Sequence, residues 1–89
     1  MTYDIRNITD RAYEMVTSNG WSKDWLKGGC YLFLECAEFV ESLRGKGNPI
    51  EEAGDVLVAF LSMVKYNNID LDDIINAFNE KTQEWIKNQ

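Results

Sequence analysis

Residues 35–55 read ECAEFVESLRGKGNPIEEAGD. This stretch carries one pair of acids at a spacing of three on each side of a short, glycine-containing connection at 44–47. Asn48 and Pro49 follow the connection, and they are typical of the N-cap and the first position of a helix. A connection this short makes the two helices that it joins antiparallel neighbours. The stretch therefore predicts a helical hairpin whose two arms face each other with carboxylates.

Outward from this hairpin, apolar residues recur at spacings of three and four along the whole chain, which is typical of amphipathic helices. Asn19-Gly20 and Asn67-Asn68 are the remaining breaks, and Pro49 is the single proline. The pattern predicts an all-α fold of the four-helix bundle type, with residues 1–89 forming a single domain. The predicted helices span residues 4–18, 23–44, 49–66 and 71–86.

The second predicted helix contains both a long apolar stripe and two consecutive glycines. Gly28-Gly29 costs helix propensity, on the order of 1 kcal/mol per glycine. The pair therefore indicates a late helix start, a kink, or the close approach of another backbone or a ligand. The apolar stripe of this helix consists of Leu26, Cys30, Phe33, Leu34, Ala37, Val40 and Leu43.

Composition excludes several classes of function. The 89 residues contain nine Lys and Arg against fifteen Asp and Glu, so the formal net charge is −6, and there is no histidine. A catalytic Ser-His pair, a histidine general base and histidine-ligated zinc are therefore excluded. The acidic balance argues against direct binding to nucleic acid or to a membrane surface, because both favour a basic face.

Size and cysteine usage add two further expectations. A domain of this length buries a modest core, and such chains often gain stability by forming homo-oligomers. Cys30 and Cys36 would lie about 9 Å apart along one helix, too far to form a disulfide with each other. We expect them to be reduced and partly buried, as in a cytoplasmic protein. The longest nearly apolar run, residues 56–64, is too short for a membrane span.

The acids are not evenly spread along the chain. Residues 28–43 and 47–64 contain six acids and no basic residue, and these six equal the net charge. In an antiparallel hairpin, the two acidic pairs lie at matching heights, offset by about two residues or 3 Å along the axis. Facing carboxylates repel one another, whereas a hard divalent cation such as Mg²⁺, or alternatively Mn²⁺, would neutralise them. Solvated helix faces are the structural alternative. The paired acids are Glu35, Glu38, Glu52 and Asp55.

Three motifs together resemble the MazG-like, all-α nucleoside triphosphate pyrophosphohydrolase superfamily. They are the ExxE of residues 35–38, the ExxD of residues 52–55 within EEAGDVL, and the NEK of residues 79–81. The resemblance covers residues 27–81, over half of the chain. The chain departs from the family pattern at Leu34, where a second acid often precedes ExxE, and at Glu84-Trp85, where arginines often follow NEK.

The resemblance implies a helical enzyme that forms a dimer or tetramer around Mg²⁺. It implies hydrolysis of nucleoside triphosphates between the α and β phosphates, which yields a nucleoside monophosphate and pyrophosphate. Glu35 or Glu38 would also orient or deprotonate the attacking water, as the catalytic residue. Asn79 and Lys81 would lie near the nucleotide or its phosphates. The implied metal ligands are Glu35, Glu38, Glu52 and Asp55.

Four residues near the start of the first acidic helix are weighed as further substrate contacts. Trp21, Trp25 and Tyr31 could stack on a base or could pack in a core or interface, and Trp25 is the preferred base contact. Lys27 could offer a point charge to a phosphate or be an ordinary surface lysine. Two alternative functions stay open at this point: a non-catalytic acidic binding module or nucleic-acid mimic, and a pyrophosphohydrolase of the same fold acting on dUTP or phosphoribosyl-ATP.

Overall fold

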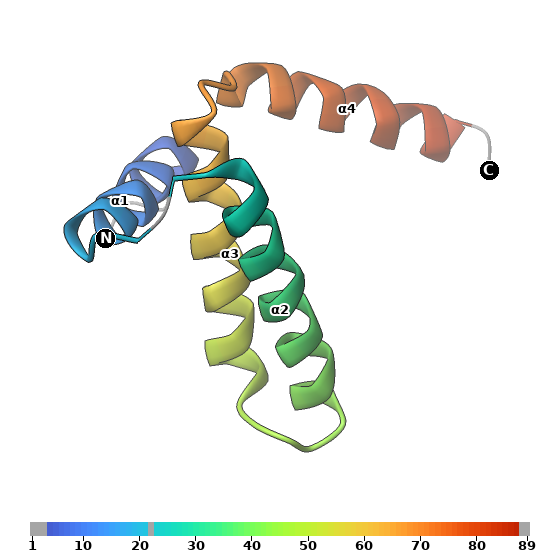
Figure 1. Ribbon diagram of the computed structural model, residues 1–89. Helices are drawn as coiled ribbons and strands as arrows, with labels where there is room; N and C mark the ends of the chain where they lie inside the picture. Colours follow the sequence, from blue (N-terminus) through green and yellow to red (C-terminus); the bar gives the residue numbers. More distant parts are fainter. Residues whose placement is uncertain (1–3, 22, 88–89) are drawn as a thin grey trace.

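The computed structural model describes residues 4–21 and 23–87, and every regular element in this part of the chain is an α-helix. The helices are α1 (Ile5–Ser18), α2 (Trp25–Leu43), α3 (Pro49–Tyr66) and α4 (Leu71–Lys87) (Figure 1). The sequence prediction of an all-α chain with four helices is confirmed, and each boundary lies within two residues of its predicted place. No helix in the described ranges is long and apolar enough to cross a membrane.

Local hydrogen bonds explain where the helices begin. Asn48 caps α3, because its side chain accepts a hydrogen bond from the backbone N–H of Ile50 at 3.0 Å, and Pro49 occupies the first turn. Asp4 and Asp24 cap α1 and α2 in the same way. Asp70 caps α4 by accepting from the N–H of Asp72 at 2.8 Å. These side chains satisfy backbone donors that the first turn of a helix leaves without a partner.

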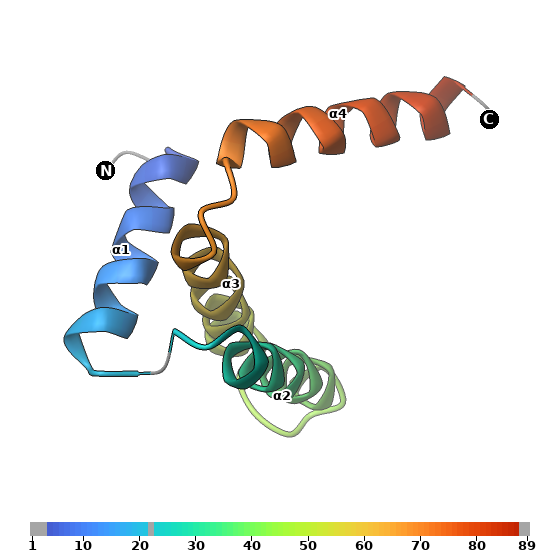
Figure 2. The same cartoon turned by 45° about the horizontal axis from the view of Figure 1, so that its top comes forward.

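Helix α3 is the centre of the fold, and α1 and α2 pack against two of its sides (Figures 1 and 2). Among the described residues, the buried apolar side chains come from α1 and α3, and they are Ala12, Val16, Leu61 and Val64. Helix α4 makes few contacts with the other three and extends away from them. Within a single chain, the packed unit therefore contains three helices rather than a closed bundle of four.

The face of α2 that packs on α3 differs from the apolar stripe of the sequence prediction. All seven residues of that stripe are exposed, from Leu26 to Leu43. The side toward α3 instead carries buried or half-buried residues at spacings of four and three, namely Gly28, Leu32, Glu35, Phe39 and Ser42. The apolar stripe of the prediction is therefore not the packed face, because the packed face combines two large apolar residues with Gly28, Glu35 and Ser42.

The two cysteines also differ from the prediction. Both are free, as expected, but both are exposed instead of partly buried. The reason is their position on α2: Cys30 belongs to the exposed stripe, and Cys36 lies beside it.

Gly28 marks a close helix–helix approach, which is one of the three explanations that the sequence left open. Both glycines lie inside α2, so the helix does not start late. A Cβ atom at Gly28 would lie 1.9 Å from the hydroxyl of Tyr66, whereas a Cβ atom at Gly29 would meet nothing within 4 Å. Gly28 therefore allows the C-terminal end of α3 to contact the first turns of α2.

Candidate metal centre

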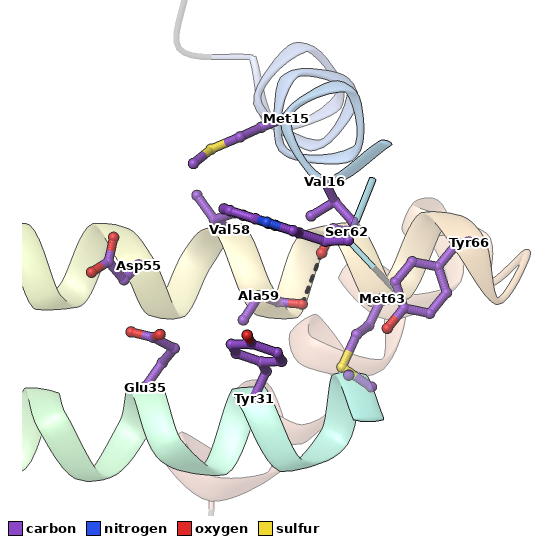
Figure 3. Close-up of a pocket in the computed structure, with 12 residues that line it drawn as sticks. Met15, Val16, Tyr31, Glu35, Asp55, Val58, Ala59, Ser62, Met63 and Tyr66 are labelled. Atoms are coloured by element: carbon purple, nitrogen blue, oxygen red, sulfur yellow. Dashed lines mark hydrogen bonds between the residues drawn. The ribbon is translucent and has the colours of Figure 1, made fainter. Parts of the chain in front are cut away.

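Three carboxylates converge between α2 and α3. One oxygen from each of Glu35, Glu52 and Asp55 lies within 4.8 Å of the others. Glu35 comes from α2, and the other two lie one turn apart on α3. Figure 3 shows Glu35 extending from α2 toward α3, the helix that carries Asp55. The antiparallel pairing expected from the short connection therefore brings the ExxE and ExxD motifs to the same height.

Two oxygens in this cluster are buried without a protein partner. The Oε2 atoms of Glu35 and Glu52 are inaccessible to solvent and accept no hydrogen bond from residues 4–21 or 23–87. A buried carboxylate oxygen without a donor is unfavourable, and more so when the group is charged. Among the described residues, these two oxygens therefore have no positively charged or hydrogen-bond-donating partner.

The electrostatics agree with this geometry. Burial raises the pKa of Glu35, and the nearby charges of Glu38, Asp55 and Glu52 raise it further. The pKa of Glu52 is raised by the same causes, with burial again first and Glu38 and Asp55 next. Both groups therefore hold protons more strongly than an ordinary glutamate when no cation is bound. Glu38 does not belong to the converging triad, but it lies close enough to raise the pKa of two of its members.

The basic residues of the described chain form their ion pairs elsewhere. Arg44 and Lys46 pair with Glu41 at 3.2 and 3.8 Å. Arg6 pairs with Asp72, and Lys65 pairs with Asp10. Among the described residues, no ion pair involves the four acids of the two motifs. A donor set of carboxylate oxygens, without cysteine or histidine, suits a hard cation such as Mg²⁺ or Mn²⁺.

A cavity of about 370 Å³ adjoins the acidic cluster. Glu35 and Asp55 form part of its wall, and the rest of the wall is mostly apolar and aromatic (Figure 3). This volume is typical of sites that bind small molecules. The other lining residues come from α1, α2, α3 and the segment after α1, and they are Met15, Val16, Trp21, Gly28, Tyr31, Val58, Ala59, Ser62, Met63 and Tyr66.

The remaining predicted contacts lie outside this wall. Trp25 and Lys27 are exposed on the first turn of α2, and Trp25 keeps 67% of its surface accessible. Asn79 and Lys81 are exposed on α4. None of these four residues lines the cavity, so their roles as substrate contacts stay predictions.

The cavity also contains residues that the sequence did not identify as site residues. Tyr66 is the clearest case: its hydroxyl is buried without a hydrogen-bond partner, and burial, followed by the charge of Asp24, raises its pKa. Tyr66 lies on the same face of α3 as Asp55, because Ala59 and Ser62 connect the two at steps of four, three and four. Helical spacing could therefore have identified Tyr66 from the sequence. Trp21 and Tyr31 were weighed as stacking residues, and both line the cavity.

Comparisons with protein-family models, with curated proteins and with solved structures found no match for this chain. The resemblance of its motifs to the MazG-like superfamily therefore stays a prediction. The chemistry of the site is argued below from the residues and their geometry.

Proposed function

We propose that this chain is a Mg²⁺-dependent nucleoside triphosphate pyrophosphohydrolase that acts as a homo-oligomer, a dimer or tetramer, in the cytoplasm. One observation carries the proposal: three carboxylates without counter-charges converge beside a cavity large enough for a nucleoside. A triphosphate would be repelled by such a cluster unless it arrived together with cations. The pairing of ExxE with ExxD supports the same activity. The free cysteines support only the cytoplasmic location, where thiols stay reduced.

Each residue of the cluster has a role in the proposed reaction. Glu35, Glu52 and Asp55 would hold the cation, with Glu38 beside them. When bound, Mg²⁺ or Mn²⁺ would neutralise phosphate charge and favour deprotonation of water. A water oxygen attacks the α phosphorus, the bond from that phosphorus to the α–β bridging oxygen breaks, and pyrophosphate leaves. The proton of the water passes to Glu35 or Glu38.

The cavity supports a nucleotide as substrate. Its aromatic lining, including Trp21 and Tyr31, offers flat apolar surfaces on which a base could stack. The candidate contacts to the base and phosphates are Trp25, Lys27, Asn79 and Lys81. Asn79 and Lys81 belong to α4, which lies apart from the cavity in a single chain. dUTP and phosphoribosyl-ATP are alternative substrates within the same reaction type. A nucleic-acid mimic would spread its acids over exposed surface, whereas Glu35 and Glu52 are partly buried.

A substrate panel tests the proposal. The protein is incubated with Mg²⁺ and each of the common ribonucleoside and deoxyribonucleoside triphosphates, dUTP and phosphoribosyl-ATP, and pyrophosphate is measured. We expect release from at least one of them and none in EDTA. Absence of release from every substrate with both Mg²⁺ and Mn²⁺ would contradict the enzyme assignment.

Two substitutions test the site. Glu38→Gln and Asp55→Asn remove one negative charge each at nearly constant volume, and we expect turnover to fall by about 100-fold or more. Glu41→Gln is the matched control on the same helix, because Glu41 pairs with Arg44 and Lys46 outside the cluster. Circular dichroism checks that all three variants stay helical. Full activity of both cluster variants would show that the site lies elsewhere.

A further inference from the structure

A second cavity, of about 380 Å³, lies between α1 and α3. Met15 and Val58 line both this cavity and the one beside the acidic cluster, so the two spaces adjoin along this pair of residues. Figure 3 shows Met15 extending from α1 toward Val58, which lies one turn of α3 beyond Asp55. The second cavity therefore adjoins the first at the end where the acidic cluster lies.

Arg11 is the charged residue of this second cavity. Among the described residues that line it, all others are apolar side chains or Gly54, which directly precedes Asp55. A Cβ atom at Gly54 would meet nothing within 4 Å, so the backbone next to the acidic cluster borders open space. The described wall of the first cavity contains acids but no basic residue. Arg11 therefore supplies the positive charge of the two adjoining cavities.

The position of Arg11 on α1 directs its side chain to this place. It lies one turn before Met15 and next to Ala12, which is buried against α3. The aliphatic stem of Arg11 therefore begins at the edge of the contact between α1 and α3, and its charged end is exposed. A long side chain placed in this way can reach a ligand that extends from the first cavity into the second.

The guanidinium of Arg11 is available to such a ligand. Within residues 4–21 and 23–87, no ion pair or hydrogen bond involves this side chain, whereas the other two arginines of the chain pair with Asp72 and Glu41. A guanidinium stays charged at every physiological pH and presents a planar set of N–H donors. This geometry matches two oxygens of a phosphate group, and such charge-assisted hydrogen bonds are about twice as strong as neutral ones.

We infer that Arg11 binds the β and γ phosphates of the substrate and neutralises the pyrophosphate as it leaves. This inference rests on the proposed function, from which it takes the triphosphate. With the base on the aromatic lining and the α phosphate at the acidic cluster, the other two phosphates point away from the base. They then lie beside Asp55 and Gly54, where the second cavity begins.

Binding by Arg11 makes the number of phosphates a criterion of selection. A nucleoside monophosphate can fill the first cavity and reach the acidic cluster, but it has no group that extends to Arg11. A triphosphate gains the additional ion pair, and the same ion pair becomes stronger as negative charge accumulates on the leaving pyrophosphate. Arg11 is therefore a determinant of phosphate number and not of the base.

Two substitutions separate phosphate binding from a packing role. The stem of an arginine often covers apolar surface while the charged end stays in water, and in that case Arg11 would contribute to stability alone. Arg11→Gln removes the charge and shortens the stem. Arg11→Met also removes the charge but keeps an unbranched apolar side chain over the cavity, so it preserves the cover. Circular dichroism and melting temperatures show whether both variants fold.

Equilibrium binding tests the inference without turnover. Inorganic pyrophosphate and each of the four ribonucleoside monophosphates are titrated separately into the protein in Mg²⁺, and calorimetry gives the dissociation constants. Both Arg11 variants are expected to bind pyrophosphate at least about 10-fold more weakly and to change monophosphate binding by less than about 2-fold. Arg44→Gln is the matched control, because it removes the same charge from a side chain that pairs with Glu41 outside both cavities, and it should leave all these constants unchanged.

Kinetics distinguish failure of this inference from failure of the proposed function. With a triphosphate that the wild type hydrolyses, both Arg11 variants should raise KM at least about 10-fold. If the wild type is active and the variants keep its KM and its affinity for pyrophosphate, the inference is wrong and the proposed function stands. If the wild type hydrolyses no triphosphate, the proposed function fails and the titrations alone decide. A wild type that does not bind pyrophosphate, or an Arg11→Met variant that binds it equally well, would overturn the inference.

Discussion

At the residue scale, Glu35 and Glu52 determine how the acidic cluster responds to protons and cations. Both have an oxygen that is buried and without a partner, and both have a raised pKa. Both properties arise because several carboxylates converge without a basic residue among them. In the proposed function, the same two side chains would connect the stability of the chain with the binding of metal.

The first prediction concerns pH without metal. Because the folded pKa values of Glu35 and Glu52 lie above the ordinary value of 4.5, the folded chain binds these protons more readily than the unfolded chain. The stabilisation from these two groups is complete below the ordinary pKa and is lost as the pH rises through the raised folded pKa. In EDTA, Glu52→Gln should therefore increase the melting temperature at pH 7 but not at pH 4. An equal effect at both pH values would contradict the raised pKa.

The second prediction concerns metal. In the proposed function, Mg²⁺ is held by the deprotonated carboxylates, so it should stabilise the protein at neutral pH and lose this effect in acid. At 100 times its dissociation constant, a bound ligand adds about 2.7 kcal/mol, which raises the melting temperature by roughly 10 °C or more. Calorimetry with Mg²⁺, against NaCl of equal ionic strength, measures the shift. The Asp55→Asn variant should show little of it, and an unchanged shift in that variant would exclude Asp55 as a ligand.

At the element scale, the contact between α2 and α3 depends on a glycine as much as on apolar side chains. The hydroxyl of Tyr66 occupies the space where a side chain at Gly28 would begin. The neighbouring Gly29 has free space around it on the same helix. This pair allows the packing constraint to be separated from the general cost of glycine in a helix.

Gly28→Ala is predicted to destabilise the fold. The added methyl group would overpack the contact at a cost of about 1–3 kcal/mol, which exceeds the gain of up to about 1 kcal/mol in helix propensity. Gly29→Ala meets no neighbour and should be stabilising by up to about 1 kcal/mol. Urea denaturation measures both. In the Tyr66→Phe background, which removes the crowding hydroxyl, most of the loss at Gly28 should disappear. A stabilising Gly28→Ala in the wild type would show that α3 does not approach there.

At the scale of the whole molecule, the chain does not form a compact unit by itself. Helix α3 packs with α1 and α2, whereas α4 and the apolar stripe of α2 that contains Leu26, Phe33 and Val40 present apolar surface to solvent. Folding and association are therefore expected to be coupled, since the core of one copy is small.

Coupled folding predicts that stability depends on protein concentration. A tenfold increase in concentration changes the free energy of a dimer-coupled unfolding reaction by about 1.4 kcal/mol, which shifts the melting temperature of a chain this size by a few degrees. Melting curves over a hundredfold range of concentration measure this dependence. Phe33→Glu should remove it, and Ile50→Glu should retain it. A wild-type melting temperature independent of concentration would show that one copy folds alone.

The sequence alone determined the helices and the pairing of the acidic motifs. Helix spacing and the caps Asn48 and Asp70 are local features, since they depend on hydrogen bonds and side-chain periodicity within a few residues. The short connection at 44–47 then determined the antiparallel register, which places Glu35 opposite Asp55. These features are readable without tertiary contacts because chain geometry alone sets them.

Only the tertiary structure decided which face of α2 packs inward, where α4 lies, and which residues surround the cavity. Apolar periodicity identifies an apolar face but does not say which surface covers it. In α2, Gly28, which lacks a side chain, and the partly buried Glu35 belong to the face toward α3. The apolar stripe that contains Phe33 remains exposed. The physical reason is that packing depends on the shape and charge of both surfaces, and these meet only after the chain has folded.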